Sequence, residues 1–295
     1  MSTLSRRTFL TVAAALAGRA AAAGPLSAAG VATHPFASDS LLNLSSGSPL
    51  SRPGLQLYTV RKLMERDFDG TLSTIARIGY REVEFAGYFG RPPAQVAASL
   101  SRIGLSAPSS HIPYAMLGEG WERTIEECLA IGHRYITIPW LPAPATLDGW
   151  YEIAERFNEA AREARLSGLG FAYHNHDFEF RPLEGKIPFD VLLERTDPQL
   201  VSFEMDIYWL VRAGYDPLEY LAGFPGRFPL FHVKDSAGPP DHRMTDVGNG
   251  VIDFATILAS ATEAGALHFF VEHDSPEEPM RSIRTSYAAL AALRG

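Results

Sequence analysis

Four short apolar runs in the second half of the chain each end in two polar residues separated by one position. These pairs are His174 and His176, Glu204 and Asp206, His232 and Lys234, and Glu272 and Asp274. Side chains at positions i and i+2 of a strand point to the same side of the sheet, so each pair faces one way. If the four strands are neighbours in a parallel barrel, imidazoles and carboxylates converge at the ends of the strands. Enzymes built on such barrels carry their chemistry at that end.

The rest of the chain repeats one unit from Gly54 onward: an apolar strand, a polar loop, an amphipathic helix and a glycine. The predicted strands are Leu55–Thr59, Glu82–Ala86, Leu105–Ile112, Tyr135–Trp140, Gly170–His176, Val201–Trp209, Pro229–Asp235 and Leu267–Asp274. The glycines expected to end helices are Gly79, Gly104, Gly132, Gly168 and Gly265, and the residues expected to cap helix starts are Asp69, Asp148 and Asp253. Eight strands alternating with helices predict an α/β fold, a single-domain (β/α)₈ TIM barrel over residues 52–295. An open doubly wound sheet is the alternative, but no G-x-G-x-x-G motif follows the first strand.

Composition narrows the classes of partner. The net charge is −8 over 295 residues, and no basic cluster lies beyond the N-terminus. Nucleic acid and anionic membrane surfaces are therefore poor candidates for partners. Cys128 is the single cysteine, so an internal disulfide is excluded, and its place in a helical pattern predicts a small buried residue.

The N-terminus predicts export. Arg6 and Arg7 followed by Phe9 and Leu10 precede an alanine-rich run, which is typical of a twin-arginine signal. We expect residues 1–30 to be the signal and residues 31–51 to be a linker. The apolar run is too short and too weakly hydrophobic for a permanent membrane span, and no cysteine follows it to carry a lipid anchor. The expected location is periplasmic or exported, with the twin-arginine export machinery as a partner.

The inward residues of the last four strands predict a metal site formed by His174, Asp206, His232 and Glu272. Two imidazoles and two carboxylates suit one divalent ion such as Mn, Co, Fe or Zn rather than Ca. The alternative is a network of ion pairs at the mouth of the barrel.

Other polar residues near the strand ends are candidates for catalysis and substrate binding. Glu272 and His176 are candidates for the base, and Lys234 could hold a substrate oxygen or pair with Asp206 or Glu272. Glu204 lies one pleat below Asp206, where a supporting hydrogen bond is expected. The substrate-binding candidates are Glu84, His111, Trp140 and Trp209. The segment from residue 246 to residue 250 is expected to be a rigid loop rather than a phosphate site.

Several of these motifs resemble the xylose-isomerase-like TIM-barrel superfamily. They are His232-Val-Lys-Asp235, Glu204-Met-Asp206-x-x-Trp209, the loop from Val247 to Phe254, and Val271-Glu272. The run YHNHDFEF is similar to a subgroup described as sugar phosphate isomerase/epimerase-like. In the keto-sugar epimerases of this superfamily the metal ligands are Glu, Asp, His and Glu, so Asp206, His232 and Glu272 match while His174 replaces a glutamate. Their second glutamate on the fifth strand has no clear counterpart, since Glu179 is out of register.

The resemblance implies a metal-dependent sugar isomerase or epimerase that works through a metal-stabilised enediolate. A lyase or hydrolase of keto-glycosides would use the same enolate to expel a leaving group. A third hypothesis is a periplasmic sugar-binding protein without turnover. A fourth is an endonuclease acting on abasic DNA, but the chain lacks the histidines and the basic face that such an enzyme needs. A small carbohydrate is the expected substrate, and a homo-oligomer is left open.

Overall fold

The structure is a computed structural model that describes residues 49–293. The predicted twin-arginine signal and most of the predicted linker lie outside the described residues. The end of that linker, Pro49–Ser51, forms a short 3-10 helix, η1. Within the described part of the chain, no helix is long and apolar enough to cross a membrane.

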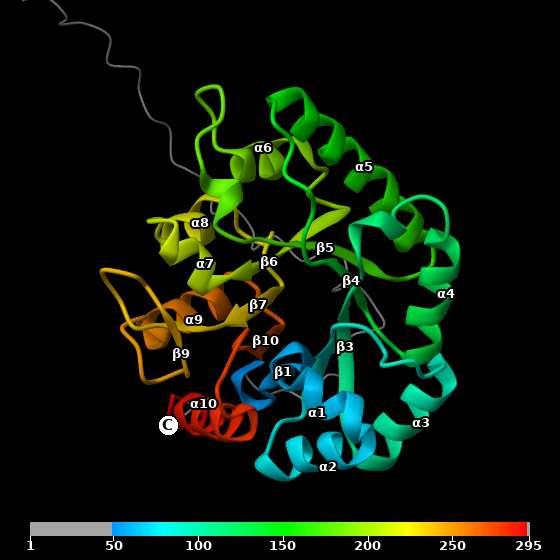
Figure 1. The fold of residues 1–295 in the computed structure, drawn as a ribbon. Coiled ribbons are helices and arrows are strands. Elements are labelled where there is room, and N and C mark those ends of the chain that lie inside the picture. Colours follow the sequence, from blue (N-terminus) through cyan, green and yellow to red (C-terminus); the bar gives the residue numbers. More distant parts are fainter. Residues whose placement is uncertain (1–48, 294–295) are drawn as a thin grey trace, which may run out of the picture. The chain divides into compact units, whose positions relative to one another are not determined.

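Eight parallel strands close into a barrel at the centre of Figure 1, which confirms the predicted (β/α)₈ fold. They are β1 (Gly54–Gln56), β2 (Glu82–Phe85), β3 (Ser106–His111), β4 (Tyr135–Ile138), β5 (Gly170–His174), β6 (Val201–Asp206), β7 (Leu230–Val233) and β10 (His268–Val271). Around the barrel the order is β1-β10-β7-β6-β5-β4-β3-β2, so β5, β6, β7 and β10 are consecutive neighbours. Asp206 pairs with His232, and His232 pairs with Phe270, in the registers of the parallel ladders.

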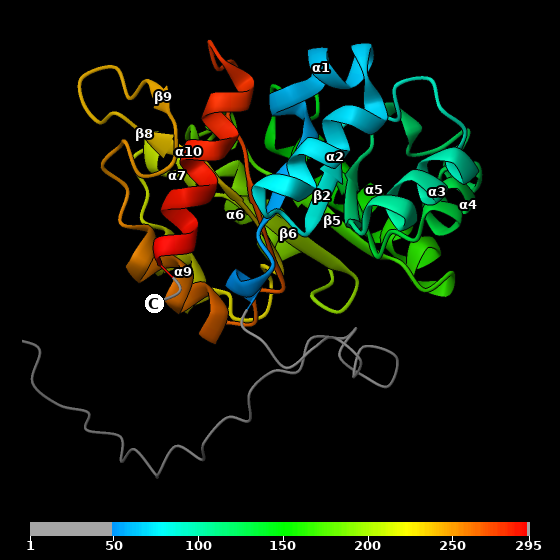
Figure 2. The same cartoon turned by 90° about the horizontal axis from the view of Figure 1, so that it is seen from below.

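The helices lie outside the ring of strands (Figure 1). They are α1 (Arg61–Arg66), α2 (Phe68–Ile78), α3 (Pro93–Ile103), α4 (Trp121–Ile131), α5 (Leu147–Leu166), α6 (Pro188–Arg195), α7 (Ile207–Arg212), α8 (Pro217–Gly223), α9 (Phe254–Glu263) and α10 (Pro279–Ala292). The short 3-10 helices are η2 (Leu57–Val60), η3 (Tyr114–Met116) and η4 (Phe178–Phe180). A small antiparallel ribbon, β8 (Asp235–Ser236) with β9 (Met244–Thr245), follows β7. Figure 2 shows this ribbon and α1 at the same end of the barrel, the end where the strands finish.

Helix boundaries follow the predicted pattern with two corrections. All five predicted glycines follow their helices with a positive φ, which glycine adopts without a steric penalty. Asp253 caps α9 as expected, but Asp69 and Asp148 do not cap their helices. Asp67 and Thr146 accept the hydrogen bonds from the backbone N–H groups instead, since each helix begins two residues earlier than the predicted cap allows. The displaced aspartates lie in the first turn, where the helix dipole favours an acid.

The barrel interior is layered along its axis. A buried ion pair between Glu82 and His268 lies where β2 and β10 begin. A small apolar layer, formed by Tyr135, Ala172, Leu230 and Phe270, lies next to it, and the larger core packs the helices against the outside of the strands. Towards the ends of the strands, one pleat further along, buried charged and polar side chains replace the apolar ones. Buried charges are stable only when they are paired or hold an ion, so this layer is the candidate functional site.

Candidate metal and substrate site

Lys234 lies among three carboxylates at the ends of β6, β7 and β10. Its Nζ is 3.0 Å from Asp206 Oδ2, 2.7 Å from Glu272 Oε2 and 2.8 Å from Asp274 Oδ1. The side chain is buried, and burial alone would lower its pKa. The three carboxylates outweigh burial and raise the pKa of Lys234 well above its usual range, so the ammonium stays charged.

A second centre lies on Glu204, deeper in the barrel. Its Oε2 is 2.9 Å from His111 Nε2, 3.1 Å from His174 Nδ1 and 3.2 Å from His232 Nε2. Burial would raise the pKa of Glu204, but the surrounding imidazoles hold it well below the usual range. Glu204 is therefore an ionised acceptor that orients three histidines, in keeping with the supporting hydrogen bond expected from the sequence.

Glu84 was predicted to bind substrate, but it belongs to this deeper centre and is not on the cavity lining, and its role in substrate binding stays a prediction. Its Oε2 is 2.6 Å from His232 Nε2 and accepts a hydrogen bond of 2.7 Å from Gln56 Nε2. The carboxylate is fully buried. The pleat explains the difference, because Ala86, two residues further along, is the residue that reaches the cavity.

His232 joins the two centres. Its Nδ1 is 2.8 Å from Glu272 Oε2, while its Nε2 contacts Glu84 and Glu204. Burial would lower the pKa of His232, but the carboxylates on both sides raise it well above the usual range. His174 is different, because burial keeps its pKa well below the usual range and the ring is neutral.

The donor atoms fit a divalent ion. One ligand atom each from Asp206, His232 and Glu272 lies within 4.8 Å of the others, and His174 Nε2 is 3.5 Å from Asp206 Oδ2. Asp206 Oδ2 is buried without a well-aligned hydrogen bond, although it is in ionic contact with Lys234. A buried carboxylate oxygen of this kind, facing imidazole and carboxylate donors, is what Mn²⁺, Fe²⁺, Co²⁺ or Zn²⁺ requires. His174 also belongs to a second group of potential ligands with His111, Glu204 and His232. There Glu204 lies between the imidazoles and already satisfies them. The four predicted ligands thus lie together, and their role as ligands stays a prediction.

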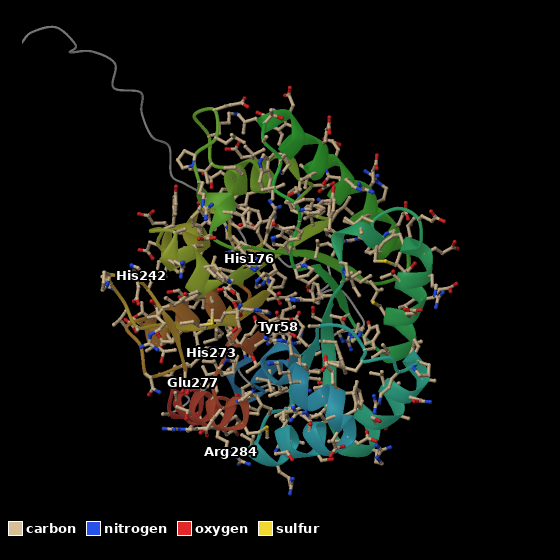
Figure 3. The ribbon with its side chains drawn as sticks, in the orientation of Figure 1. Tyr58, His176, His242, His273, Glu277 and Arg284 are labelled. Atoms are coloured by element: carbon tan, nitrogen blue, oxygen red, sulfur yellow. The ribbon has the colours of Figure 1, made fainter. Side chains whose placement is uncertain are left out.

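A cavity of about 650 Å³ opens above these centres. Its lining includes the predicted residues His111, Trp140, His174, His176, Lys234 and Glu272, together with Tyr58 and Tyr88. In Figure 3, Tyr58 and His176 both lie over the central ring of strands. Asp206 and His232 are fully buried beneath this wall. The cavity therefore brings together the rim residues that the sequence assigned to catalysis.

Trp209, a second residue predicted to bind substrate, is not on the cavity lining, and its role stays a prediction. Strand β6 ends at Asp206, whose carboxylate accepts a hydrogen bond from the backbone N–H of Trp209 and begins α7. The Trp209 ring packs against His176, with ring centroids 5.4 Å apart. This packing places His176 at the cavity wall, and burial lowers the pKa of His176 to about 3. The imidazole is neutral, with a buried Nδ1 that has no hydrogen-bond partner.

Asp235 is a structural residue that sequence reasoning missed. Its carboxylate accepts hydrogen bonds from the backbone N–H groups of Ser236, Gly248, Gly250 and Ile252. These hydrogen bonds hold the loop after β9 in place. They agree with the expectation that this segment is a rigid loop rather than a phosphate site. The sequence feature that could have indicated this role is an aspartate that follows a buried strand and precedes a glycine-rich loop.

A closed parallel barrel with imidazoles and carboxylates at the strand ends, beside a cavity, defines a TIM-barrel protein with a candidate metal site. Residues 72–293 match the model of the family described as xylose isomerase-like TIM barrel. The chain belongs to this family.

Relatives in the family include enzymes of two reaction classes. The chain is 25% identical over 265 residues to an inosose dehydratase of Geobacillus kaustophilus, covering 76% of this chain and 84% of the relative. It is 25% identical to a solved sugar phosphate isomerase/epimerase from Parabacteroides distasonis, with a TM-score of 0.74 and coverage of 82% of this chain and 97% of that one. The IolI protein, solved with a bound zinc atom, shares the fold at a TM-score of 0.67 and 13% identity, with coverage of 82% and 97%. A dehydratase and an isomerase/epimerase are thus both similar to this chain.

Proposed function

We propose that the protein is a metal-dependent lyase that removes a proton beside the ketone of an oxidised sugar or glycoside and eliminates a substituent from the next carbon. His174, Asp206, His232 and Glu272 would hold the ion. A divalent ion there would act as a Lewis acid on the substrate carbonyl and stabilise charge that develops on its oxygen. The similarity to inosose dehydratase supports elimination as the reaction class.

The main support for this proposal is the set of side chains that the end of β5 and the residues after it present to the cavity. Epimerisation needs proton-transfer groups on both faces of the reacting carbon, and the keto-sugar epimerases use two glutamates. Here β5 presents His174 and His176 to the cavity. Glu179 is turned away, since it accepts hydrogen bonds from the Tyr173 hydroxyl at 2.5 Å and from the His176 backbone N–H at 3.0 Å. Elimination needs only one proton acceptor, and this arrangement provides one.

The rim residues divide the work of proton transfer. His176 is neutral and lines the cavity, so it can accept the proton. Glu272 is the other candidate for the base: burial would raise its pKa, but Lys234 and His232 hold it well below the usual range, so both candidates have a lowered pKa. The Lys234 ammonium can donate a hydrogen bond to a substrate oxygen that gains negative charge.

Isomerisation is the second candidate function. The similarity to the Parabacteroides sugar phosphate isomerase/epimerase favours it, and a 1,2-isomerase returns the proton on the same face and also needs one group. The first test is metal content by mass spectrometry on protein purified without a His-tag. About one equivalent of Mn, Co, Fe or Zn is expected, and metal should be lost in Asp206→Asn and His232→Gln. Full occupancy in both variants would refute the site.

The second test separates the two reactions. Keto-sugars and keto-glycosides are incubated with metal-loaded protein in D₂O and followed by NMR. Elimination releases the substituent and produces an unsaturated ketone, whereas isomerisation moves the carbonyl or incorporates deuterium with every substituent retained. If the protein binds the sugar without incorporating deuterium or releasing a substituent, and Glu272→Gln binds it with the same affinity, the result would favour the non-catalytic sugar-binding protein.

We also propose that the protein is exported by the twin-arginine route, on the basis of Arg6 and Arg7. An extracytoplasmic location suits a glycoside substrate better than a phosphorylated cytosolic metabolite. Cell fractionation of wild type and of a variant with both arginines replaced by lysine tests this. Equal export of the two would contradict it.

A further inference from the structure

The cavity is larger than the proposed reaction at the polar centre requires. Its volume of about 650 Å³ lies within the range of roughly 300–1,000 Å³ typical of pockets for drug-sized ligands. A single sugar ring displaces less than this volume, so a substrate that fills the cavity has a second part beside the ring.

The two ends of the cavity differ in chemistry. The wall from β5, β7 and β10 carries imidazole, ammonium and carboxylate groups. The wall from β3, β4 and the segments that follow them is formed by Ile112, Pro113, Met116, Pro139 and Trp140. Trp140 is 53% exposed, which leaves much of its ring uncovered at the edge of the cavity. We call these five residues the apolar wall.

The polar groups beside the apolar wall already have partners. The Tyr88 hydroxyl is 3.1 Å from His133 Nε2, and the Thr124 hydroxyl donates to a carbonyl of its own helix at 3.0 Å. Glu127 accepts a hydrogen bond of 2.9 Å from Arg123. A second sugar would bury several hydroxyl groups here with few groups to bond them, which is unfavourable. A flat aromatic ring would need no such partners and could pack on Trp140.

We propose that the apolar wall binds the aromatic aglycone of a glycoside whose oxidised sugar ring lies at the polar centre. This inference rests on the proposed function and adds the class of the leaving group. The proton on the carbon between the ketone and the anomeric carbon passes to the protein. Its electron pair forms a carbon–carbon double bond, and the anomeric C–O bond breaks. The aglycone oxygen takes that bonding pair and a proton from solvent, so a phenol leaves and no oxidant or reductant is consumed.

Calorimetry with three glycosides of 3-ketoglucose tests the proposal. Their anomeric substituents are methyl, phenyl and glucosyl, and each is titrated into the full chain, both after EDTA treatment and with Mn²⁺. The phenyl glycoside should bind about tenfold more tightly than the methyl glycoside, the rough size expected from ring stacking. The glucosyl compound should bind no more tightly than the methyl one.

Variants of Trp140 locate the effect. Trp140→Ala should remove most of the preference for the phenyl over the methyl glycoside, and Trp140→Phe should restore that preference. Leu166→Ala, at a residue 85% exposed and away from the cavity lining, is the matched control and should bind like wild type.

The outcomes separate this inference from the proposed function. Three results would overturn the apolar wall as an aglycone site and leave the lyase proposal standing. They are measurable binding of the methyl and phenyl glycosides with equal affinity, tightest binding of the glucosyl compound, and an unchanged preference for the phenyl glycoside in Trp140→Ala. Failure of all three compounds to bind, with and without Mn²⁺, would overturn the lyase proposal as well.

Discussion

Replacing Lys234 by methionine tests the electrostatics of the site most directly. The ammonium lies within 3.0 Å of carboxylate oxygens on Asp206, Glu272 and Asp274, and the lysine is almost fully buried. Methionine fills a similar volume without the charge, so buried carboxylates lose a partner. Removing one partner of a buried ion pair costs roughly 3–5 kcal/mol. In a domain of this size roughly 3 kcal/mol corresponds to a fall in Tm of about 6–12 °C.

The pH of the assay matters because burial raises the pKa of Asp206 to about 6. At lower pH this carboxyl group can take a proton and relieve part of the cost. Lys234 lowers this pKa in wild type, so its removal raises the pKa of Asp206 further, and the cost of the substitution should grow as the pH rises; thermal and urea unfolding in EDTA at pH 6 and pH 8 measure it.

Metal should rescue the variant. A divalent ion on Asp206, His232 and Glu272 would neutralise the same carboxylates that Lys234 neutralises in its absence. An ion at 100 times its Kd stabilises a protein by about 2.7 kcal/mol. Wild type gains stability from the ion as well, so the difference narrows only by the ratio of the two Kd values. Binding that is about tenfold tighter in Lys234→Met corresponds to roughly 1.4 kcal/mol and would remove about half of a difference of roughly 3 kcal/mol.

Two results would refute this reasoning. An equal difference in Tm with EDTA and with Mn²⁺ would show that the ion does not bind these carboxylates. No difference in EDTA would show that the ammonium does not neutralise them. Lys62→Met, at an exposed lysine, is the matched control and should lie within about 0.5 kcal/mol of wild type in both conditions.

Two further predictions concern the support of the site. Burial raises the pKa of Glu179 to about 8, so between the ordinary carboxyl range and pH 8 the folded state keeps a proton that the unfolded state releases. Stability from this group is therefore lost as the pH rises through that window. Relative to wild type, the free energy of unfolding of Glu179→Gln should increase by a few kcal/mol between pH 5 and pH 8. A difference between variant and wild type in urea unfolding that is the same at both pH values would contradict this. Gly250→Ala should lower stability by roughly 1–3 kcal/mol, because the added methyl group would collide with the Asp235 carboxylate; a Tm equal to that of wild type would show that the loop yields without cost.

The sequence predicts the identity of the rim residues because a strand alternates its side chains with a period of two. Once eight strands were expected, His174, Asp206, His232 and Glu272 had to face the same interior. The depth of a residue along the axis is harder to predict, because it depends on where each strand ends. Glu84 and Trp209 illustrate this, since Glu84 lies one pleat deeper than expected and Trp209 lies in α7, which begins at the end of β6.

Contacts between side chains of different strands could not be read from the pattern. Glu204 contacts histidines from three other strands, and Gln56 reaches Glu84 from the neighbouring strand β1. Such contacts depend on the stagger of the closed barrel, which strand patterns do not specify. The rigid loop was predicted, but its cause was not, since the four hydrogen bonds to Asp235 exist only after the chain has folded back on itself.

The position of His232 makes the deeper centre part of the metal chemistry. It is protonated in the ion-free network because carboxylates lie against both of its nitrogens. A metal ligand must present a nitrogen lone pair, so an ion that binds His232 has to displace a proton. Nδ1 faces Glu272 and would lose its proton to the ion, whereas Nε2 would keep a proton for its contacts with Glu84 and Glu204. The buried carboxylates below the rim therefore do more than fill the barrel. They raise the pKa of His232, and through it they would set how strongly the proposed site holds a metal.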